Sequence, residues 1–443
     1  MFKKSLLAFV LVTSLVADEA DALLEGFDDA PSTEVSTDEN DALLEGFDEV
    51  ETSTKAEKIE VEKAYNFEGK FTQSVAYSFH NDKPHDGLSS VKSTLFLEYN
   101  HKLPKDFKLK INANAFYDLA YNIKARDDFS KEDIDALESE VELFDAYIQG
   151  SLSDKLDMKI GHQVVVWGKS DTIRITDVIN PLDNRRPAMV DIEEMRLPTA
   201  MLKFDYYHDK WKISPIMIVQ QKFNKNPPFG GDFNPNPQKI PKQKIPHSPS
   251  FALNVAGEFS AFDVDFYFAD IYAQDELGLP FVSHDEKMQM FGIALNYVYD
   301  TWLFKGEFAY KKDFQFLADA GKKYDRIDSL LGFEYRGIAD TTFSYDVANK
   351  HMGDKSPLFE QDSYQHAFRA TSDFLNATVH GNYLIALFGE KLDKGGFQRA
   401  WVKYDIADGI SANVGLVDYI AGSPMLDAID DNDMIFVDVA YSF

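Results

Sequence analysis

The charged side chains whose spacing most suggests a shared function lie in residues 167–198, WGKSDTIRITDVINPLDNRRPAMVDIEEMRLP. The stretch is too long for a simple hairpin connection, so a functional segment is expected. Opposed charges that face a narrow water-filled passage select solutes by charge and size. The alternative is an external loop whose charges are only solvated, and we favour the inward position. The charged residues of the stretch are Lys169, Asp171, Arg174, Asp177, Asp183, Arg185, Arg186, Asp191, Glu193, Glu194 and Arg196.

Catalytic and metal chemistry have little support in the sequence. There is no cysteine, and we find neither a histidine cluster nor a nucleophile motif with a supporting spacing. The three aspartates of AIDDND (428–433) could hold calcium, but they lack the regular spacing of a calcium loop, which favours a solvated acidic loop. Asn180 and Pro181 predict a turn, and Asp183 is expected to cap it rather than bind metal. We expect no catalytic residue, metal or cofactor, and the formal net charge of -29 argues against nucleic acid.

From residue 65 onward, apolar residues recur at every second position, which is the period of a β-strand. In FKLKINANAFYDL, for example, Phe107, Leu109 and Ile111 share one face. Polar and charged residues occupy the other face of the predicted strands and are expected to line an interior. The charged members that we assign to this inner face are Lys108, Lys110, Lys305, Glu307, Arg399 and Lys403.

Short and long connections alternate along this part of the chain. Short joints such as SDK and HDK are followed by long connections near 80–90, 122–139, 167–198, 221–249, 273–287, 312–327, 349–362, 389–396 and 421–433. An outer-membrane barrel keeps tight turns at one end and long loops at the other, whereas a sandwich has no reason to do so. The sequence therefore predicts an all-β, antiparallel up-and-down transmembrane barrel of about 18 strands (16–18) over 65–443. The Pro-rich basic connection 221–249 is expected to be extended and external.

The chain ends on MIFVDVAYSF, in which Tyr441 and Phe443 continue an alternating apolar face. This ending resembles the C-terminal signal of bacterial outer-membrane proteins, which the barrel-assembly machinery recognises. We expect the apolar face to meet outer-membrane lipid. The last strand should pair with the first, because unpaired backbone groups are costly in hydrocarbon.

The stretch ELFDAYIQGSLSDKLDMKIGHQVVVWGKSDTIRITDVINPLD resembles a family of proteobacterial outer-membrane barrels whose defining domain bears only an unknown-function label. Val164 and Val166 are expected to continue a lipid-facing strand up to Trp167. The resemblance implies that the gene lies near genes for transporters of the resistance–nodulation–division type and their periplasmic partners. This association suggests export of hydrophobic compounds. His162 stands where an arginine is common in that family. The residues that carry the resemblance are Leu143, Ala146, Tyr147, Gly161, Gln163, Trp167, Gly168, Ile179, Asn180, Pro181 and Asp183.

The N-terminal part of the sequence predicts a secreted chain with an acidic spacer. Residues 1–17 have the basic start and short apolar core of a signal peptide. Residues 18–64 are strongly acidic and are expected to form a disordered periplasmic segment. This segment repeats DALLEGFD, which suggests two docking motifs for a periplasmic protein, while a duplicated solvated spacer is the alternative. The apolar residues of the motifs are Leu23, Leu24, Phe27, Leu43, Leu44 and Phe47.

Two functions agree with these observations. The first is a porin-like outer-membrane channel for small solutes or for the export of hydrophobic compounds, in which several barrels could form a homo-oligomer. The second is a non-enzymatic outer-membrane component of an export or lipid-transport system, which docks a periplasmic partner through the repeats. Dependence on residues 18–50 distinguishes them, because a porin should conduct without that segment.

Overall fold

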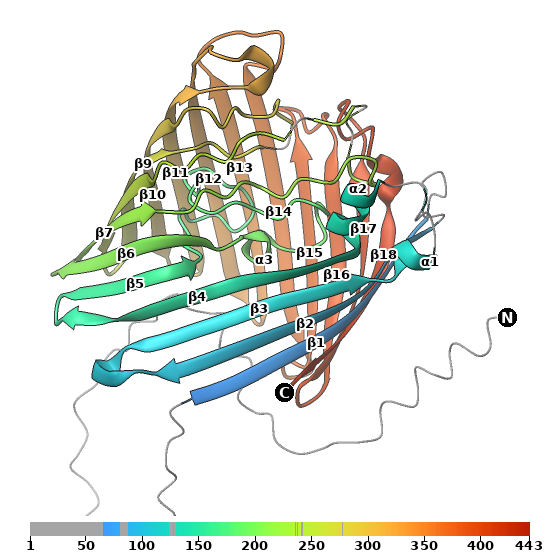
Figure 1. The fold of residues 1–443 in the computed structure, drawn as a ribbon, viewed down its shortest axis with the longest axis horizontal. Coiled ribbons are helices and arrows are strands. Elements are labelled where there is room, and N and C mark those ends of the chain that lie inside the picture. The colour runs from blue at the N-terminus through green and yellow to red at the C-terminus, as the bar shows by residue number, and fades with distance from the viewer. Residues whose placement is uncertain are drawn as a thin grey trace, which may run out of the picture.

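The computed structural model describes residues 65–79, 87–123, 127, 130–234, 236, 238–240, 242–276 and 278–443. The predicted signal peptide and the acidic segment with its two repeats lie outside the described residues. Eighteen antiparallel strands form one sheet in the described part, and each strand pairs with its sequence neighbours (Figure 1). The strands are β1 (Tyr65–Ser78), β2 (Leu88–Lys102), β3 (Lys108–Asp118), β4 (Ser139–Ser153), β5 (Leu156–Gln163), β6 (Thr199–His208), β7 (Trp211–Ile218), β8 (Ser250–Glu258), β9 (Phe262–Ile271), β10 (Met288–Tyr299), β11 (Trp302–Phe314), β12 (Tyr324–Ile338), β13 (Thr341–Met352), β14 (Asp362–Phe374), β15 (Val379–Phe388), β16 (Gly396–Ala407), β17 (Ile410–Ile420) and β18 (Met434–Ser442).

The sheet closes on itself through the first and last strands. Pairing of β1 with β18 runs from Lys70 opposite Ser442 to Ser78 opposite Met434. Beyond it, Gly69 and Phe443 exchange two backbone hydrogen bonds of 2.8 Å. The closed antiparallel barrel of 18 strands predicted from the sequence is therefore confirmed.

The two ends of the barrel differ in the length of their connections. One end carries the short turns, beginning with residues 103–107 and 154–155, and the other carries the long loops, of which 164–198 and 219–249 are the longest. Both β1 and β18 meet the short-turn end, since Tyr65 pairs with His101 and Ser442 donates its backbone N–H to Gly409. The described residues also include the short helices α1 (Ala120–Ile123), α2 (Lys131–Glu138) and α3 (Ile192–Met195), and the 3-10 turns η1 (Pro104–Asp106), η3 (Leu317–Asp319) and η4 (Asp430–Asn432).

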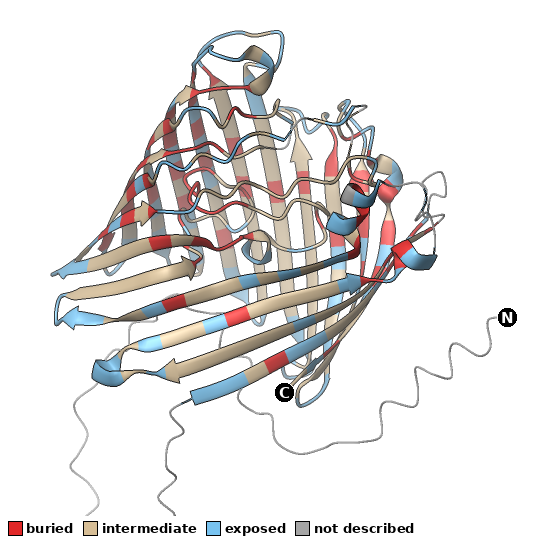
Figure 2. Ribbon diagram, in the orientation of Figure 1, coloured by how far each residue is buried: buried red, intermediate tan, exposed pale blue. Residues whose placement is uncertain are grey.

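The alternation of side chains between two faces is clear in the structure. On β11, Phe304 and Phe308 are 44% and 43% exposed on the outer face, while Lys305 and Glu307 between them are each 5% exposed. Buried and exposed residues accordingly alternate along many strands in Figure 2. On β18, Ile435, Val437 and Tyr441 point outward, and Phe436 is buried on the inner face.

The largest apolar core lies inside the barrel, where the residues of the connection 164–198 pack on the inner faces of β6 to β14. One sequence expectation fails at the start of this connection. Strand β5 ends at Gln163, four residues before Trp167, so Val164 and Val166 do not extend a lipid-facing strand. Val165 is instead buried and donates its backbone N–H to Asn180, which shows that the chain has already left the sheet. Among the described residues, no helix is both long and apolar enough to cross a membrane.

Candidate functional site

The candidate site is the connection between β5 and β6, residues 164–198, which we call the inserted segment. Gln163 and Thr199 pair directly in the barrel wall, so the segment leaves and rejoins the wall at one point. Its side chains reach Asp265 of β9, Lys305 of β11 and Arg369 of β14. These strands follow one another around the ring, and Figure 1 shows α3 within the ring of strands. The inserted segment therefore lies inside the barrel and contacts its wall on several sides.

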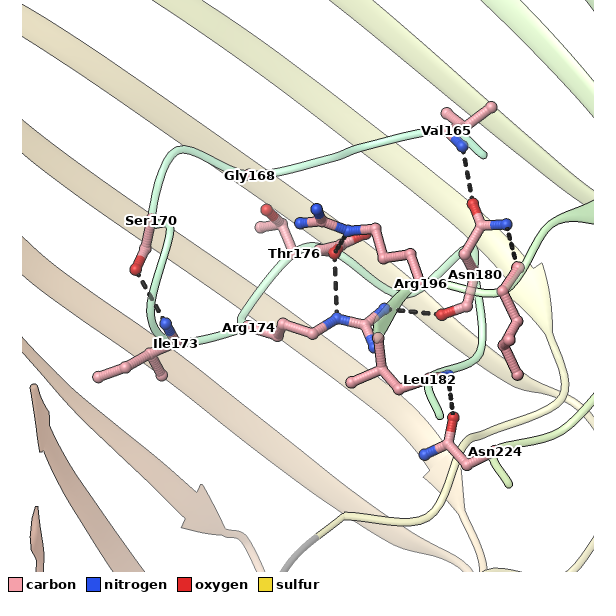
Figure 3. Close-up of polar contacts among 12 residues, drawn as sticks. Val165, Gly168, Ser170, Ile173, Arg174, Thr176, Asn180, Leu182, Arg196 and Asn224 are labelled. Atoms are coloured by element: carbon pink, nitrogen blue, oxygen red, sulfur yellow. Dashed lines mark hydrogen bonds and ion pairs between the residues drawn. The ribbon is translucent and has the colours of Figure 1, made fainter. Parts of the chain in front are cut away.

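Asn180 holds the base of the inserted segment together. Its Oδ1 accepts the backbone N–H of Val165 at 2.8 Å, and its Nδ2 donates to the backbone oxygens of Leu197 (2.8 Å) and Gln163 (3.3 Å) (Figure 3). The side chain is fully buried. Because it joins the outgoing chain to the returning chain, Asn180 divides the inserted segment into a first loop, residues 164–180, and a second loop, residues 181–198.

The first loop is packed against the inner wall by apolar contacts. Trp167 is 3% exposed and stacks on Tyr267 of β9, with ring centroids 4.6 Å apart. Ile173 and Ile175 are buried in the same cluster, together with Met290 of β10 and other inward residues of β8 to β14. Burial of large side chains on this scale stabilises the first loop in a single position.

Glu307 is the main polar anchor of the first loop. Its Oε1 accepts the backbone N–H groups of Lys169 (2.6 Å) and Ser170 (2.9 Å), and its Oε2 accepts the N–H and hydroxyl of Thr176 (3.2 and 2.7 Å). Asp346 of β13 adds two more bonds, because it accepts the hydroxyls of Ser170 (2.7 Å) and Thr172 (2.6 Å). Buried carboxylates of the wall therefore bind donors of the segment.

The backbone makes room for this contact at Gly168. Its φ is +87°, a conformation that glycine adopts without steric cost. A Cβ at this position would lie 2.9 Å from both carboxylate oxygens of Glu307. Glycine is required here both for the turn and for the close approach of the backbone to Glu307.

Two arginines, the buried Arg196 and the half-buried Arg174, share one carboxylate at the junction of the loops. Arg174 and Arg196 each place Nε 3.0 Å from Oδ2 of Asp177, and Arg174 Nη2 also donates to the backbone oxygen of Asn180 at 2.9 Å. Figure 3 shows these contacts around the base of the first loop. A buried guanidinium is costly unless it is paired, so these contacts fix the two loops relative to each other.

The second loop begins as two antiparallel arms. Leu182 and Arg196 form a β-bridge, and Asp183 donates its backbone N–H to Met195 at 2.7 Å. The Asp183 carboxylate accepts the backbone N–H of Arg185 at 3.2 Å, which is a capping role. Burial alone would raise the pKa of Asp183, but the hydrogen bonds and charge of Arg185 lower it below its usual value. Arg185 also pairs with Glu140 of β4 at 2.7 Å.

Arginines of the wall hold the tip of the second loop, whereas carboxylates of the wall accept most of the polar contacts of the first loop. Asp191 accepts Arg369 of β14 at 2.9 Å and Arg399 of β16 at 2.5 Å. Arg399 further donates to the backbone oxygen of Ala188 at 3.3 Å, and Ala188 packs beside Tyr419 and Phe436. Here arginines of the wall bind a carboxylate of the segment, and fewer apolar residues of the second loop than of the first are buried against the wall.

Two glutamates of α3 face the interior of the barrel. Glu193 and Glu194 are exposed, although they lie within the ring of strands. The surrounding protein removes part of their hydration and raises the pKa of both, and the negative charge of Asp171 adds to this effect on Glu193, as that of Asp191 does on Glu194. The inserted segment thus presents a negative surface to the interior.

The structure separates the predicted lining residues into two groups. Arg196 within the segment and Lys305, Glu307 and Arg399 of the wall are 4–5% exposed and hold the inserted segment through hydrogen bonds and ion pairs, so they do not present their charge to water. Lys110 and Lys403 lie toward the short-turn end, where they pair with Glu98 at 3.1 Å and Asp405 at 3.2 Å. Lys108 is exposed at the start of β3 and lies apart from the segment.

Sequence reasoning did not assign several wall residues that the segment uses. Tyr267, Asp346 and Arg369 bind it, and all three occupy inward positions of their strands. For Asp346 and Arg369, the sequence signal was a charged residue at an inward position of a predicted strand. That signal does not predict which residue the side chain binds. Gly161 of β5, one of the residues that carry the family resemblance, has a structural role. Its φ is +132°, and a Cβ there would clash with the backbone oxygen of Ala146, so only glycine fits at this position.

The loop 219–249 lies over the inserted segment. Its described residues contain no helix or strand, and turns at residues 229–233 break the extended conformation that the sequence predicted. Asn224 accepts the N–H of Leu182 at 2.7 Å, and Lys225 pairs with Glu142 of β4 at 2.5 Å. Phe233 is 5% exposed and packs beside Ala188. Figure 1 shows this loop crossing from β7 toward α2 and β17, so it narrows the long-loop end of the barrel.

Known structures resemble this architecture. OccAB1 from Acinetobacter baumannii aligns with a TM-score of 0.56 and 9% identity, covering 86% of this chain and 97% of that chain. OccAB2 from the same organism aligns with a TM-score of 0.52 and 11% identity, covering 86% of this chain and 98% of that chain. The outer membrane protein OpdK from Pseudomonas aeruginosa aligns with a TM-score of 0.51 and 9% identity, covering 85% of this chain and 99% of that chain. At these identities the likeness concerns the fold alone.

A search of curated proteins gives no match. A family model described as "Protein of unknown function (DUF1302)" matches residues 79–443, which is most of the chain and all but the first of the strands. The match confirms the resemblance to an unknown-function family that residues 140–200 suggested. The chain belongs to the DUF1302 family.

Proposed function

We propose that the protein is a passive outer-membrane channel whose passage is narrowed by the inserted segment. The observation that carries this proposal is a closed barrel of 18 strands that is apolar outside and holds a polar, charged segment inside. A barrel of this size has room for an aqueous lumen, which loops can narrow. The fold that it shares with the outer membrane protein OpdK supports the same location. The proposal assigns no reaction to the chain.

Planar-bilayer recording tests the channel. The purified mature chain should give discrete conductance steps above the lipid background, and a chain lacking residues 18–64 should give the same steps. Protein heated to unfolding before addition serves as the control. The absence of steps from correctly folded protein, as judged by its heat-modifiable mobility in SDS gels, would reject the channel.

A second candidate is an outer-membrane component of an export system, and the duplicated DALLEGFD motif favours it. The described chain begins at Tyr65, at the short-turn end, where turns of outer-membrane barrels face the periplasm. A segment attached there would reach a periplasmic protein or a transporter of the resistance–nodulation–division type. Crosslinking in cells should capture such a partner with the intact chain and lose it when residues 18–50 are deleted. Identical crosslinks from both chains would remove this candidate.

A further inference from the structure

Two cations inside the barrel lack the carboxylate partner that their neighbours have. Within the inserted segment, Lys169, Arg174, Arg185 and Arg196 each have a carboxylate oxygen 2.5–3.0 Å away. Arg186 has none at ion-pair distance among the described residues, and neither has Lys92 of β2. Both side chains are half-buried, so the difference is not one of simple surface exposure.

Arg186 is held in place by neutral groups. Its Nη2 donates to the Ser89 hydroxyl, and its guanidinium lies 5.9 Å from the ring centre of Phe233. The backbone on its C-terminal side is fixed because Tyr419 donates its hydroxyl to the oxygen of Pro187 at 2.6 Å. A residue before proline also has fewer backbone conformations available. The guanidinium is therefore oriented without its charge being neutralised.

A bulge in the barrel wall supplies the hydroxyl. Ala76 pairs with Ser90 and Tyr77 pairs with Leu88, which leaves Ser89 as the extra residue of β2. Ser89 and Ser90 are 3% and 2% exposed. Bulges often re-aim a side chain near functional sites. This one turns Ser89 toward Arg186 at the long-loop end of the barrel.

Lys92 lies on the same inner surface. Its Nζ is 5.5 Å from the ring centre of Phe116, and the Arg185 guanidinium is at the same distance from that ring. Asp118 and Asp183 are the neighbouring carboxylates whose charges act on Lys92, but neither lies at ion-pair distance from it, and each is held by other donors. Asp118 accepts the Ser90 hydroxyl and the N–H groups of Val91 and Ala120, and Asp183 accepts Arg185.

Half-buried cations are costly without a counter-charge, and arginine binds carboxylates and phosphates through its planar fork of donors. We propose that Arg186, Lys92 and Ser89 bind the anionic group, a carboxylate or a phosphate, of a solute that enters from the long-loop end. The rings of Phe116 and Phe233 border the site and would contact an apolar part of that solute. The proposal rests on the channel function and names the class of solute that it takes.

Equilibrium binding tests the site without relying on conductance. The mature chain in detergent is titrated calorimetrically with inorganic phosphate, with benzoate and with neutral benzyl alcohol. Saturable binding of phosphate or benzoate is expected, with none for benzyl alcohol. The double variant K92Q/R186Q should bind at least tenfold more weakly. Arg336→Gln serves as a matched control, since it removes an interior-side cation at the short-turn end that pairs with Glu334 at 2.9 Å.

Each outcome decides the proposal. Binding of benzoate alone assigns a carboxylate, and binding of phosphate alone assigns a phosphate group. No saturable binding of either anion, or equal affinity in K92Q/R186Q and the native chain, overturns the site. Arg186→Lys keeps the charge but loses the fork, and an affinity unchanged in this variant contradicts the role of Arg186 even where the double variant fails to fold. Binding without conductance would reject the channel and keep the site.

Discussion

At the scale of single residues, Glu307 is the side chain on which the first loop depends. Its carboxylate accepts four hydrogen bonds from the segment, and Gly168 brings the backbone close enough to form them. Gly168→Ala should lower the free energy of unfolding by about 1–3 kcal/mol, because φ is +87° and the new Cβ displaces Glu307. The midpoint of thermal unfolding in lipid vesicles measures this loss.

Gly230→Ala provides the matched control for that variant. Gly230 has φ of +80°, and nothing lies within 4 Å of a Cβ built there. It therefore reports the cost of backbone strain alone. Equal losses for the two variants would show that the contact with Glu307 contributes nothing.

The sequence predicted the types of these residues better than their roles. Asn180 was expected to form a turn with Pro181, and in the structure its side chain joins the two loops where they meet. Its use as a clamp could not be predicted, because the bonds join residues from both ends of the segment. The partners of the first loop are more distant still, since Glu307 and Ser170 are separated by 137 positions. A period of two shows that Glu307 points inward and says nothing of what it meets.

At the scale of elements, the two loops of the inserted segment are held in different ways. The first loop has a large apolar contact as well as Glu307, whereas the second loop depends more on Asp191 and its two arginines. Asp191→Asn leaves the buried Arg399 without its carboxylate, which is strongly destabilising. Amide hydrogen exchange should then rise by at least tenfold in residues 185–195 and stay unchanged in 165–178.

Glu307→Gln is the reciprocal variant of Asp191→Asn. A glutamine cannot accept all four bonds, so exchange should rise in residues 168–176 while the second loop keeps its native rate. If both variants loosened the whole segment equally, the two loops would be one unit, and the division at Asn180 would be contradicted.

The acidic side chains of α3 predict a dependence of ion selectivity on pH. The pKa values of Glu193 and Glu194 are raised, so both become neutral at a pH above the ordinary value of 4.5. A raised carboxyl pKa also means that the native state binds more protons than the unfolded chain, and stability from these groups falls as pH rises through the raised pKa. Preference for cations, measured as the reversal potential in a KCl gradient, should therefore decrease as the pH is lowered from 7 to 4.5, the ordinary pKa of a glutamate.

The double variant E193Q/E194Q should remove most of that pH dependence. Glu390→Gln, an exposed change in the loop after β15, should leave it unaltered. A native pH response that persists in E193Q/E194Q would place its origin elsewhere in the barrel.

At the scale of the whole molecule, the alternation of side chains and of connection lengths contained nearly all of the architecture. The number of strands follows from the period of two in the sequence, which is a local pattern. Closure of the sheet follows from the general requirement that every backbone group in lipid be hydrogen-bonded. The alternation of short and long connections shows which end carries the long loops. The inserted segment disrupts this regularity at β5, where Gln163 ends the strand although the four residues that follow, Val164–Trp167, are all apolar. Residues that leave the wall and pack inside keep an apolar pattern, because the interior cluster there is apolar as well.

Closure of the barrel makes the last strand a test of the entire fold. Removing residues 434–443 leaves β1 and β17 each with an unpaired edge, and lipid does not tolerate such edges. The truncated chain should therefore give no heat-modifiable barrel, either in cells or after refolding into vesicles. Phe443→Ala is the informative partner variant, because the two bonds between residues 69 and 443 involve only backbone groups.

The Phe443 ring lies over Gly69, so that a Cβ added at Gly69 would clash with the ring. The ring therefore packs on the junction of β1 and β18 but makes none of its backbone hydrogen bonds. We expect Phe443→Ala to refold in vesicles at the native yield and to reach the membrane of cells in reduced amount, because the resemblance of the C-terminus to an assembly signal predicts that the ring is recognised during assembly. Equal yields in cells would remove the assembly role of Phe443. A failure restricted to vesicles would instead show that the ring itself stabilises closure.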